Sequence, residues 1–399
     1  MPDWEPMNSK EQDTRPVPAP RLRFPGFVGE WEEKKLGQVC AVLNNLRRPI
    51  TGSQRVKGDY PYYGASGIVD YVAEYIFDEP LLLVGEDGAK WGAFEKTAFI
   101  AEGKYWVNNH AHVLKPLNSP LELIENYLSM IDLGPYVTGA APPKLTLGKL
   151  KNIPIPLPPT LPEQTRIAAA LSSLDAVIAA HQSKQDALRE HKRGLMAGLF
   201  PAEGERVPRL RFPEFEGAGE WEEKKLGEVA PLQRGHDLTS SQLVAGDVPV
   251  VYSNGIQNHH NTAIAQAPAL ITGRSGTIGK LHYIESGPYW PHNTTLYVTS
   301  FKDNNPKFIY YLYSFIDFTR FASGSGVPTL NRNDAHAFIT SIPSLPEQTR
   351  IAACLSSLDG LITAQGDHIA ALQAFKRGLM QGLFPAAAAG PSTTPETSE

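Results

Sequence analysis

The stretch LPEQTRIAA occurs twice in this chain, at residues 161–169 and again, letter for letter, at residues 345–353. Other matched segments accompany it: EWEEKKLG at 30–37 and 220–227, LSSLD at 171–175 and 355–359, and KRGLM(A/Q)GLFP at 192–201 and 376–385. The sequence between these motifs matches only faintly. Because the period is far too long for a solenoid, the pattern indicates a duplicated half-protein, each half with a divergent body and a repeated tail.

Each copy of LPEQTRIAA begins a long predicted helix. Thr160 and Ser344 each lie three residues before a glutamate, which is the capping-box pattern of a helix start. Apolar residues then recur with a 4-3-4-3 spacing, typical of helices that wrap around each other. About 35 residues at ~1.5 Å each give a helix of roughly 50 Å, ended by Gly-Leu-Phe-Pro. The residues predicted for helix–helix contact and partner docking are Ile167, Leu171, Leu174, Ile178, His181, Leu188, Ile351, Leu355, Leu358, Ile362, Gln365 and Leu372.

An antiparallel pairing in full register places His181 opposite Gln365 in the middle of this seam. One polar layer at that point would fix the register at some cost in stability. The alternative is that both side chains simply reach solvent from a narrow apolar stripe.

The two bodies have the pattern of mixed α and β structure. Apolar runs at 81–84 and 269–272 end at Gly-rich turns, which indicates strands. Residues 121–131 and 308–316 each predict one buried helix. The expected fold class is α+β: two similar mixed α/β domains, joined and separated by two long helices that form an antiparallel coiled coil with pseudo-two-fold symmetry. The expected organisation is a disordered tail (1–20), a first domain (21–160), a helix (161–200), a linker (201–208), a second domain (209–344), a second helix (345–384) and a disordered tail (385–399).

Composition narrows the class of protein. The chain has 399 residues, 42% of them hydrophobic and 20% charged, as in ordinary globular proteins. No apolar run approaches the ~20 residues of a membrane span, and the polar, Pro-rich N-terminus lacks a signal-peptide core. Cys40 and Cys354 make no disulfide framework, so a cytoplasmic location is expected. A net charge of −5 argues against a free-standing nucleic-acid binder.

Several of these segments resemble the specificity subunits of type I restriction–modification systems. The resemblance rests on LVGEDGA (83–89), on YWVNNHAHVL (105–114), and on LPEQTRIAAALSSLDAVI following PPKLTLGKLKNIPIPLPP (142–159). The order of body, long helix, body, long helix matches as well. The resemblance covers nearly all of residues 21–385.

The resemblance implies a DNA sequence-specificity subunit of a restriction system. Each body would be a target recognition domain that reads one half of a bipartite, asymmetric target on double-stranded DNA. The coiled coil would set the spacer and dock two methyltransferase subunits, to which restriction and translocase subunits are added. Those partners would share the phosphate contacts, which answers the objection from net charge. The chain itself would be non-catalytic and hold no cofactor or metal, with S-adenosylmethionine, ATP and Mg expected on the partner subunits.

Candidate DNA-contacting residues lie in or beside the Gly-rich turns that follow the predicted strands, since such loops carry function. Arg and Lys pair with guanine, and Asn can pair with adenine. The candidates in the first body are Lys90, Lys104, Asn108, Asn109, His110 and Lys144; those in the second are Arg274, Ser275, Lys280, His292, Asn293 and Arg332. For Asn109 and Asn293, which occupy equivalent positions, a structural role in the turn is the alternative.

Other motifs favour structural roles. The pairs at 105–106 and 289–290 (Tyr-Trp) are typical of a buried core rather than of base stacking. The histidines at 110, 112, 259 and 260 lack further ligands at metal-binding spacing. Residues 30–35 (EWEEKK) suggest a solvated helix start anchored by Trp31, with a partner-contact surface as the alternative.

Two other functions compete with the one that the resemblance implies. A DNA methyltransferase with fused recognition domains would need an Asn- or Asp-Pro-Pro-aromatic motif, and the nearest match, IPLPPT at 155–160, lacks the Asn or Asp. A coiled-coil scaffold with two protein-binding modules fits the helices equally well.

Overall fold

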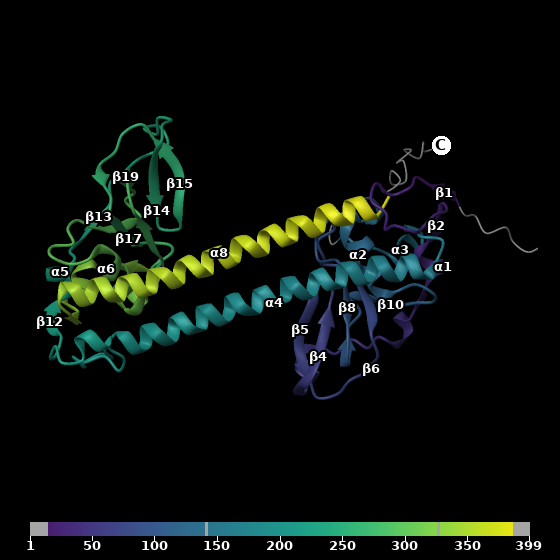
Figure 1. The fold of residues 1–399 in the computed structure, drawn as a ribbon, viewed down its shortest axis with the longest axis horizontal. Helices are drawn as coiled ribbons and strands as arrows, with labels where there is room; N and C mark the ends of the chain where they lie inside the picture. Colours follow the sequence, from purple (N-terminus) through teal and green to yellow (C-terminus); the bar gives the residue numbers. More distant parts are fainter. Residues whose placement is uncertain (1–14, 140–142, 325–327, 386–399) are drawn as a thin grey trace, which may run out of the picture. The chain divides into compact units, whose positions relative to one another are not determined.

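The computed structural model describes residues 15–139, 143–324 and 328–385. The chain divides into two compact units, residues 1–181 with 368–399 and residues 182–367 (Figure 1). The first unit contains the first body, the beginning of the first long helix and the end of the second. The second unit contains the remaining parts of both helices and the second body. Each unit is therefore assembled from both halves of the sequence.

The first body contains two four-stranded sheets. One has the order β3-β10-β7-β8, with all neighbours antiparallel. The other has the order β5-β4-β9-β6, in which β4 and β9 are parallel. The strands are β3 (Cys40–Val42), β4 (Lys57–Gly64), β5 (Gly67–Val72), β6 (Phe77–Asp78), β7 (Leu81–Gly85), β8 (Ala98–Ala101), β9 (Lys104–Val107) and β10 (Ala111–Pro116). The predicted strand β7 is buried along its whole length, which explains its continuous apolar run.

The second body repeats this topology. Its two four-stranded sheets have the orders β13-β20-β17-β18 and β15-β14-β19-β16, and β14 is parallel to β19. Strands β21 and β22 form a separate antiparallel pair. The strands are β13 (Leu232–Arg234), β14 (Val248–Tyr252), β15 (Gly255–His260), β16 (Ala265–Gln266), β17 (Ala269–Gly273), β18 (Leu281–Ile284), β19 (Pro288–Pro291), β20 (Thr295–Val298), β21 (Ala322–Ser323) and β22 (Thr329–Leu330). Matching strand orders built from dissimilar sequences confirm that the two bodies share one mixed α/β fold.

The helix predicted in each body is present. These helices are α2 (Leu121–Met130) and α6 (Pro306–Phe315), and both contribute to the main apolar core of their body. The shorter helices are α1 (Leu36–Val39), α3 (Leu147–Lys151), α5 (Leu226–Val229) and α7 (Arg332–Ala337). Single 3₁₀ turns are η1 (Asn44–Leu46), η2 (Gly52–Gln54), η3 (Gly134–Tyr136), η4 (Pro213–Phe215) and η5 (Phe318–Phe321).

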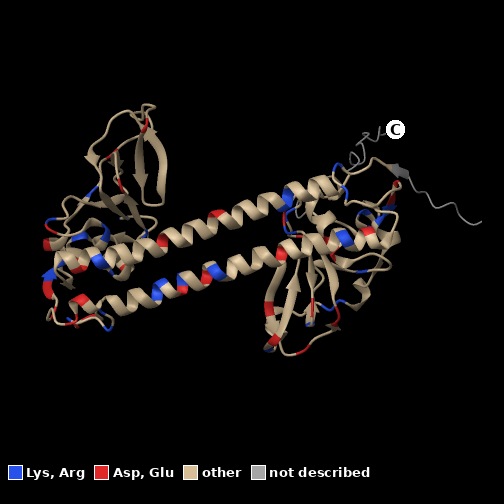
Figure 2. Ribbon diagram, viewed as in Figure 1, with Lys and Arg blue, Asp and Glu red and all other residues tan. Residues whose placement is uncertain are grey.

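The two long helices are α4 (Leu161–Leu199) and α8 (Leu345–Leu383), drawn in teal and yellow in Figure 1. At the start of α4 the Glu163 amide donates to Thr160 Oγ1 at 3.4 Å, as the capping box predicts. Every residue predicted for the seam is buried or half-buried. Charges of both signs occur along both helices (Figure 2), so apolar side chains, rather than a block of charge, define the contact face.

Pairs within each unit show that the helices are antiparallel. In the first unit Lys376 Nζ lies 2.7 Å from Asp175 Oδ1, and the rings of His181 and His368 are 4.4 Å apart. In the second unit Lys192 Nζ lies 2.6 Å from Asp359 Oδ1, and Gln185 donates to the carbonyl of Ile362 at 3.1 Å. Residue numbers rise along α4 as they fall along α8. Gln365 is buried, and its pairing with His181 stays a prediction.

In the first unit the repeated motifs bind one another. The Leu22 amide donates to the carbonyl of Gly382 at 2.8 Å, so the segment before the body pairs with the end of α8. The Trp31 ring packs edge-on against Phe384 of the Gly-Leu-Phe-Pro motif, with centroids 6.5 Å apart. These contacts explain why segments so distant in the sequence are kept together in each repeat.

The second unit makes the same contacts with the other helix. The Leu210 amide donates to the carbonyl of Gly198 at 2.9 Å, and Phe200 packs against Trp221 with ring centroids 6.3 Å apart. Here the segment before the second body pairs with the end of α4. The internal repeat therefore extends to individual hydrogen bonds.

A buried ion pair binds the start of each long helix to the segment that precedes a body. Arg23 donates twice to Glu163, at 2.7 and 2.9 Å, and Arg211 donates twice to Glu347, at 2.8 Å each. Both carboxylates are almost fully buried. The glutamates predicted to complete capping boxes therefore bind arginines of the segment before the body, an interaction with bidentate geometry.

The helix start expected at residues 30–35 is wrong. Residues 31–35 form strand β2 (Trp31–Lys35), which pairs with β11 (Pro154–Leu157). The repeated segment likewise forms β12 (Glu222–Lys225), paired with β23 (Ile339–Ile342). The charged residues of both strands stay exposed or half-buried, and the predicted anchor Trp31 is buried.

The expected disordered tail over 1–20 is wrong at β1 (Arg15–Val17), which pairs with β2. Residues 1–14 and 386–399 lie outside the described residues. Within the part of the chain that the structure describes, no helix is long and apolar enough to cross a membrane.

Candidate nucleic-acid interface

The turn after the central strand occupies an equivalent place in the two bodies. After β7, the Leu145 amide donates to the carbonyl of Glu86 at 2.8 Å; after β17, Leu330 donates to the carbonyl of Arg274 at 2.8 Å. A single β-bridge follows in each body, Asp87 with Lys144 and Ser275 with Thr329. The backbone is thus conserved, while the side chains that it presents differ in charge.

In the first body this turn carries two carboxylates that are held by cations. Arg47 lies 2.7 Å from Glu86, and Lys144 Nζ lies 3.1 Å from Asp87. His110 also binds Asp87 through Nδ1. Burial raises the pKa of Asp87, but the hydrogen bonds from His110 and Lys144 outweigh it and the net pKa is lowered. We call this cluster of Arg47, Glu86, Asp87, His110 and Lys144 the acidic turn network.

Beneath this network lies a buried polar pair. His112 Nε2 lies 2.7 Å from the carbonyl of Leu145, and its Nδ1 lies 2.9 Å from Asn44 Nδ2. Burial lowers the pKa of His112, which favours the neutral ring that can both donate and accept. This histidine is therefore structural, and within the described residues no group of three or more candidate metal ligands is found.

The remaining candidates of the first body have separate surroundings. Lys90 is strongly exposed, 3.8 Å from Glu95, and the ammonium of Lys104 lies over the Tyr75 ring at 4.7 Å. Asn108 is buried, and its Oδ1 accepts from the His110 amide at 2.7 Å. Asn108 therefore stabilises the turn, and its contact with DNA stays a prediction. Asn109 is exposed.

In the second body the turn opens onto a polar cavity of about 400 Å³. Its lining includes Arg274 and Arg332, both predicted from the sequence, and Arg234 at the end of β13. Arg274 is partly buried, whereas Arg234 and Arg332 are exposed. Among the described residues that line the cavity there is no carboxylate. Three guanidinium groups around one concave polar surface suit an anionic or acceptor-rich ligand such as nucleic acid.

Other candidates of the second body have mainly local partners. Lys280 Nζ donates to the carbonyl of Asn254 at 3.0 Å, and Asn293 binds Asp237 through its side-chain amide. The His292 ring lies 4.1 Å from that of Tyr252, and burial lowers its pKa. These three residues thus support the loops beside the cavity. Ser275 takes part in the backbone bridge already described.

Sequence reasoning missed Arg47 and Arg234. Arg47 reaches across 39 residues to Glu86, a distance that no local pattern encodes. Arg234 ends a short strand. Its position directly before a Gly was the one sequence signal that could have marked it as a residue of a functional turn. The first Tyr-Trp pair is buried as predicted, with Tyr105 and Trp106 in the core; of the second pair Tyr289 is buried and Trp290 is half-buried.

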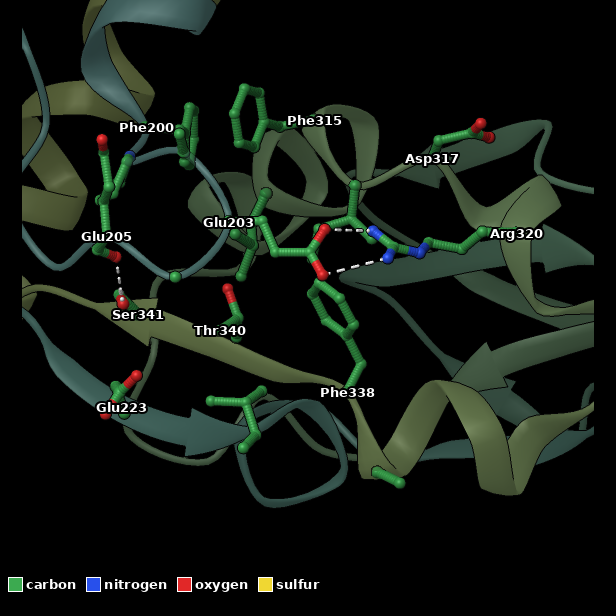
Figure 3. Close-up of a pocket in the computed structure, with 17 residues that line it drawn as sticks. Phe200, Glu203, Glu205, Glu223, Phe315, Asp317, Arg320, Phe338, Thr340 and Ser341 are labelled. Carbon is green, nitrogen blue, oxygen red and sulfur yellow. Dashed lines mark hydrogen bonds and ion pairs between the residues drawn. The ribbon is translucent and has the colours of Figure 1, made fainter.

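A larger cavity in the second unit, of about 780 Å³, has a different character (Figure 3). Its lining includes Phe200, Phe315 and Phe338, and among the described residues that line it are four carboxylates and one arginine. That arginine, Arg320, donates twice to Glu203, at 2.7 and 3.1 Å. Because it is lined by carboxylates, this cavity is unsuited to a phosphate backbone.

Four residues predicted for partner docking lie inside the bodies. Ile167 and Leu171 belong to the core of the first body, and Ile351 and Leu355 belong to that of the second. The same clusters include residues near the end of the other long helix, and partner docking through these four positions stays a prediction. The other seam residues are buried or half-buried, and partner docking through them stays a prediction.

The fold and the site together define a class of protein with two modules. The modules share one fold, are joined by antiparallel helices and present different polar turns. A family model described as the type I restriction modification DNA specificity domain matches residues 29–190 and again 218–374. The chain therefore belongs to this family of specificity subunits, and the resemblance seen in the sequence is confirmed.

Individual relatives agree with this assignment. A putative type I restriction enzyme specificity subunit of Haemophilus influenzae is 29% identical over 378 residues, covering 88% of this chain and 94% of that protein. The MjaVIII specificity subunit of Methanocaldococcus jannaschii is 25% identical over 237 residues, covering 55% of this chain and 53% of that protein.

Solved structures support the fold. The S subunit of a type I restriction–modification system from M. genitalium aligns with a TM-score of 0.62 at 15% identity, covering 93% of this chain and all of that one. A chain from a study of complex assembly and conformational transition of the type I R-M system aligns with a TM-score of 0.53 at 15% identity, covering 92% of this chain and all of that one.

Proposed function

We propose that this chain is the non-catalytic subunit that gives a type I restriction–modification complex its DNA sequence specificity. Each body reads one half of a bipartite target, and the paired long helices set the spacer between the halves. The observation that carries the proposal is that one backbone fold presents an acidic turn network in one body and an arginine-lined cavity in the other. Two different surfaces on one repeated scaffold suit the reading of two different half-sites.

The partners follow from the same proposal. Double-stranded DNA is the ligand, and two methyltransferase subunits dock on repeated surfaces so that each acts on one half-site. Those subunits carry S-adenosylmethionine, flip the target base and transfer the methyl group. Restriction and translocase subunits, with ATP and Mg, complete the complex. This chain contributes recognition and geometry.

The decisive experiment exchanges one body. Replacement of residues 209–344 by the second body of another specificity subunit is expected to change one half of the methylated sequence and leave the other half intact. The chimera is expressed with its methyltransferase subunits, and methylated motifs are mapped in host DNA. A change in both halves would refute independent reading, and a chimera with the unaltered motif would refute reading by this body.

The spacer claim has its own test. One heptad inserted into each long helix lengthens the pair by about 10 Å, close to three base pairs along DNA. The expected result is a longer spacer between two unchanged half-sites. An unchanged spacer would show that the helices do not set it.

A coiled-coil scaffold with two protein-binding modules remains the competing function. It predicts that the complex with methyltransferase subunits modifies no defined sequence. The arginine-lined cavity favours nucleic acid over this alternative.

A further inference from the structure

Three positions around the turn after the central strand can be matched between the bodies by their backbone bonds. In the register of the first sheet Val42 faces Leu114, and in that of the second sheet Leu232 faces Val298. Val42 therefore corresponds to Leu232. Two residues further along each chain segment, Asn44 of the first body corresponds to Arg234 of the second.

The hydrogen bonds of the turn match the other two positions. Leu145 donates to Glu86 and Leu330 to Arg274, so Glu86 corresponds to Arg274. Two residues further on, Leu147 corresponds to Arg332. All three arginines of the second cavity are thus replaced in the first body, by an amide, a carboxylate and an apolar side chain.

The first body uses these positions internally. Asn44 binds His112 at 2.9 Å, and its Oδ1 accepts from the Val113 amide at 2.9 Å. Glu86 is bound by Arg47, which also donates to the carbonyl of Ala111 at 2.8 Å. The polar groups of this surface are therefore satisfied within the protein and do not present a guanidinium fork.

In the second body the three arginines differ in how they are held. Arg234 lies 3.1 Å from Asp237 and half of its side chain is exposed; Arg332 is exposed at the start of α7. Arg274 is partly buried, and its backbone is fixed on both sides, since its amide donates to Thr294 and its carbonyl accepts from Leu330, each at 2.8 Å. The backbone from which the Arg274 side chain projects is therefore fixed, and Arg274 is less exposed than the other two arginines that line the cavity.

Exposure separates the roles that arginines take on DNA. Contacts with phosphates carry no sequence information, whereas an arginine that reaches a base edge can donate both fork N–H groups to O6 and N7 of guanine. Arg274 is partly buried and directly follows the buried strand β17, whereas Arg234 and Arg332 are exposed.

We propose that Arg274 reads a guanine in the half-site of the second body, with Arg234 and Arg332 binding the flanking phosphates. The first body has no counterpart of this contact, so this guanine requirement belongs to one half-site only. The proposal rests on the proposed function and names the residue that sets specificity within it.

The experiment expresses the full chain with its methyltransferase subunits and maps methylated motifs for the wild type, Arg274→Gln and Arg274→Lys. The Lys variant keeps the charge but loses the planar fork. Both variants are expected to relax one guanine position in the half-site that the body exchange assigns to the second body. Methylation of sites with another base there rises about 10- to 100-fold, the range of a good bidentate pair.

Arg320→Ala is the matched control, because Arg320 belongs to the same body but lines the acidic cavity. It is expected to leave the motif unchanged. If Arg274→Gln abolishes all methylation, the motif methylated by the Arg274→Lys complex decides between a base contact and a phosphate contact. Relaxed guanine reading supports the proposal, and an unaltered motif with uniformly weaker modification identifies a phosphate contact and overturns it.

Relaxation in the half-site of the first body would overturn it equally. A wild-type complex that methylates no two-part sequence would refute the proposed function itself, whereas a two-part wild-type motif left intact by both Arg274 variants would refute this inference alone.

Discussion

The two bodies have the same strand orders and the same backbone turn, yet fill that turn with opposite charges. In the first body two carboxylates are bound by Arg47, Lys144 and His110. In the second, Arg274 lines a cavity with two further arginines. The difference teaches that the sheets position the turn, while a few side chains decide whether it is closed by internal ion pairs or open to a ligand.

The largest expected effect compares the two ion pairs at the starts of α4 and α8. Glu347→Ala should lower the free energy of unfolding by about 3–5 kcal/mol, because it leaves Arg211 buried without its partner. Glu163→Ala should cost about 1 kcal/mol less. Glu347 also accepts from Trp221 Nε1 at 3.3 Å, whereas Trp31 Nε1 has no partner among the residues that the structure describes.

Thermal unfolding and hydrogen exchange at the first turns of α4 and α8 measure both variants. Equal losses would show that the tryptophan hydrogen bond contributes nothing to the second helix start.

The next prediction compares α2 with α6. Burial raises the pKa of Glu125 to about 7, and Tyr310 occupies the equivalent position of α6. The folded state then holds a proton that the unfolded state loses above pH ~4.5, so stability falls as pH rises from ~4.5 to 7. Glu125→Gln should therefore stabilise the first unit by about 1–3 kcal/mol at pH 8 and have little effect at pH 4.

Melting temperatures across this pH range test the prediction. Tyr310→Phe is the control, since a tyrosine does not titrate there and its effect should not vary with pH. A stabilisation by Glu125→Gln that is the same at pH 4 and pH 8 would contradict the account.

A smaller effect is expected at the turn itself. Asp87→Ala should cost about 1–2 kcal/mol by removing charge-assisted hydrogen bonds to His110 and Lys144. The equivalent Ser275→Ala should stay within about 0.5 kcal/mol. Because the pKa of Asp87 is lowered in the folded state, its contribution is present above pH ~4 and is lost as the pH falls through the folded pKa.

Denaturant unfolding at pH 7 and pH 3 measures both variants. A cost for Asp87→Ala that is the same at pH 3 as at pH 7 would point to packing rather than charge.

The smallest effect is expected for Arg320→Ala. Its ion pair with Glu203 is exposed on both sides, and such pairs contribute about 0–1 kcal/mol. A loss above ~2 kcal/mol, measured by denaturant unfolding, would show that this arginine also supports the apolar side chains that line the larger cavity.

The repeat and its periodicity predicted much of the fold. Spacing alone located α4 and α8, and apolar runs ending at Gly-rich turns located β7 and β17. The strand character of residues 31–35 was not predictable, because its partner β11 lies some 120 residues away and local charge mixing favours a helix as readily.

The candidate site was only partly predictable. Residue type and turn position predicted Arg274 and Arg332, which line the polar cavity. The same two criteria also selected Asn108, which is buried in its own turn. Whether a polar side chain points inward depends on long-range contacts such as that of Arg47 with Glu86. Sequence spacing contains no record of those contacts.

The central claim is that two unlike surfaces on one repeated fold read two unlike half-sites. Mapping methylated bases in a host that expresses the wild-type chain with its methyltransferase subunits tests it most directly. The account predicts a two-part, asymmetric motif with an unspecified spacer and a guanine in one half. A continuous motif, or a palindrome with identical halves, would contradict it.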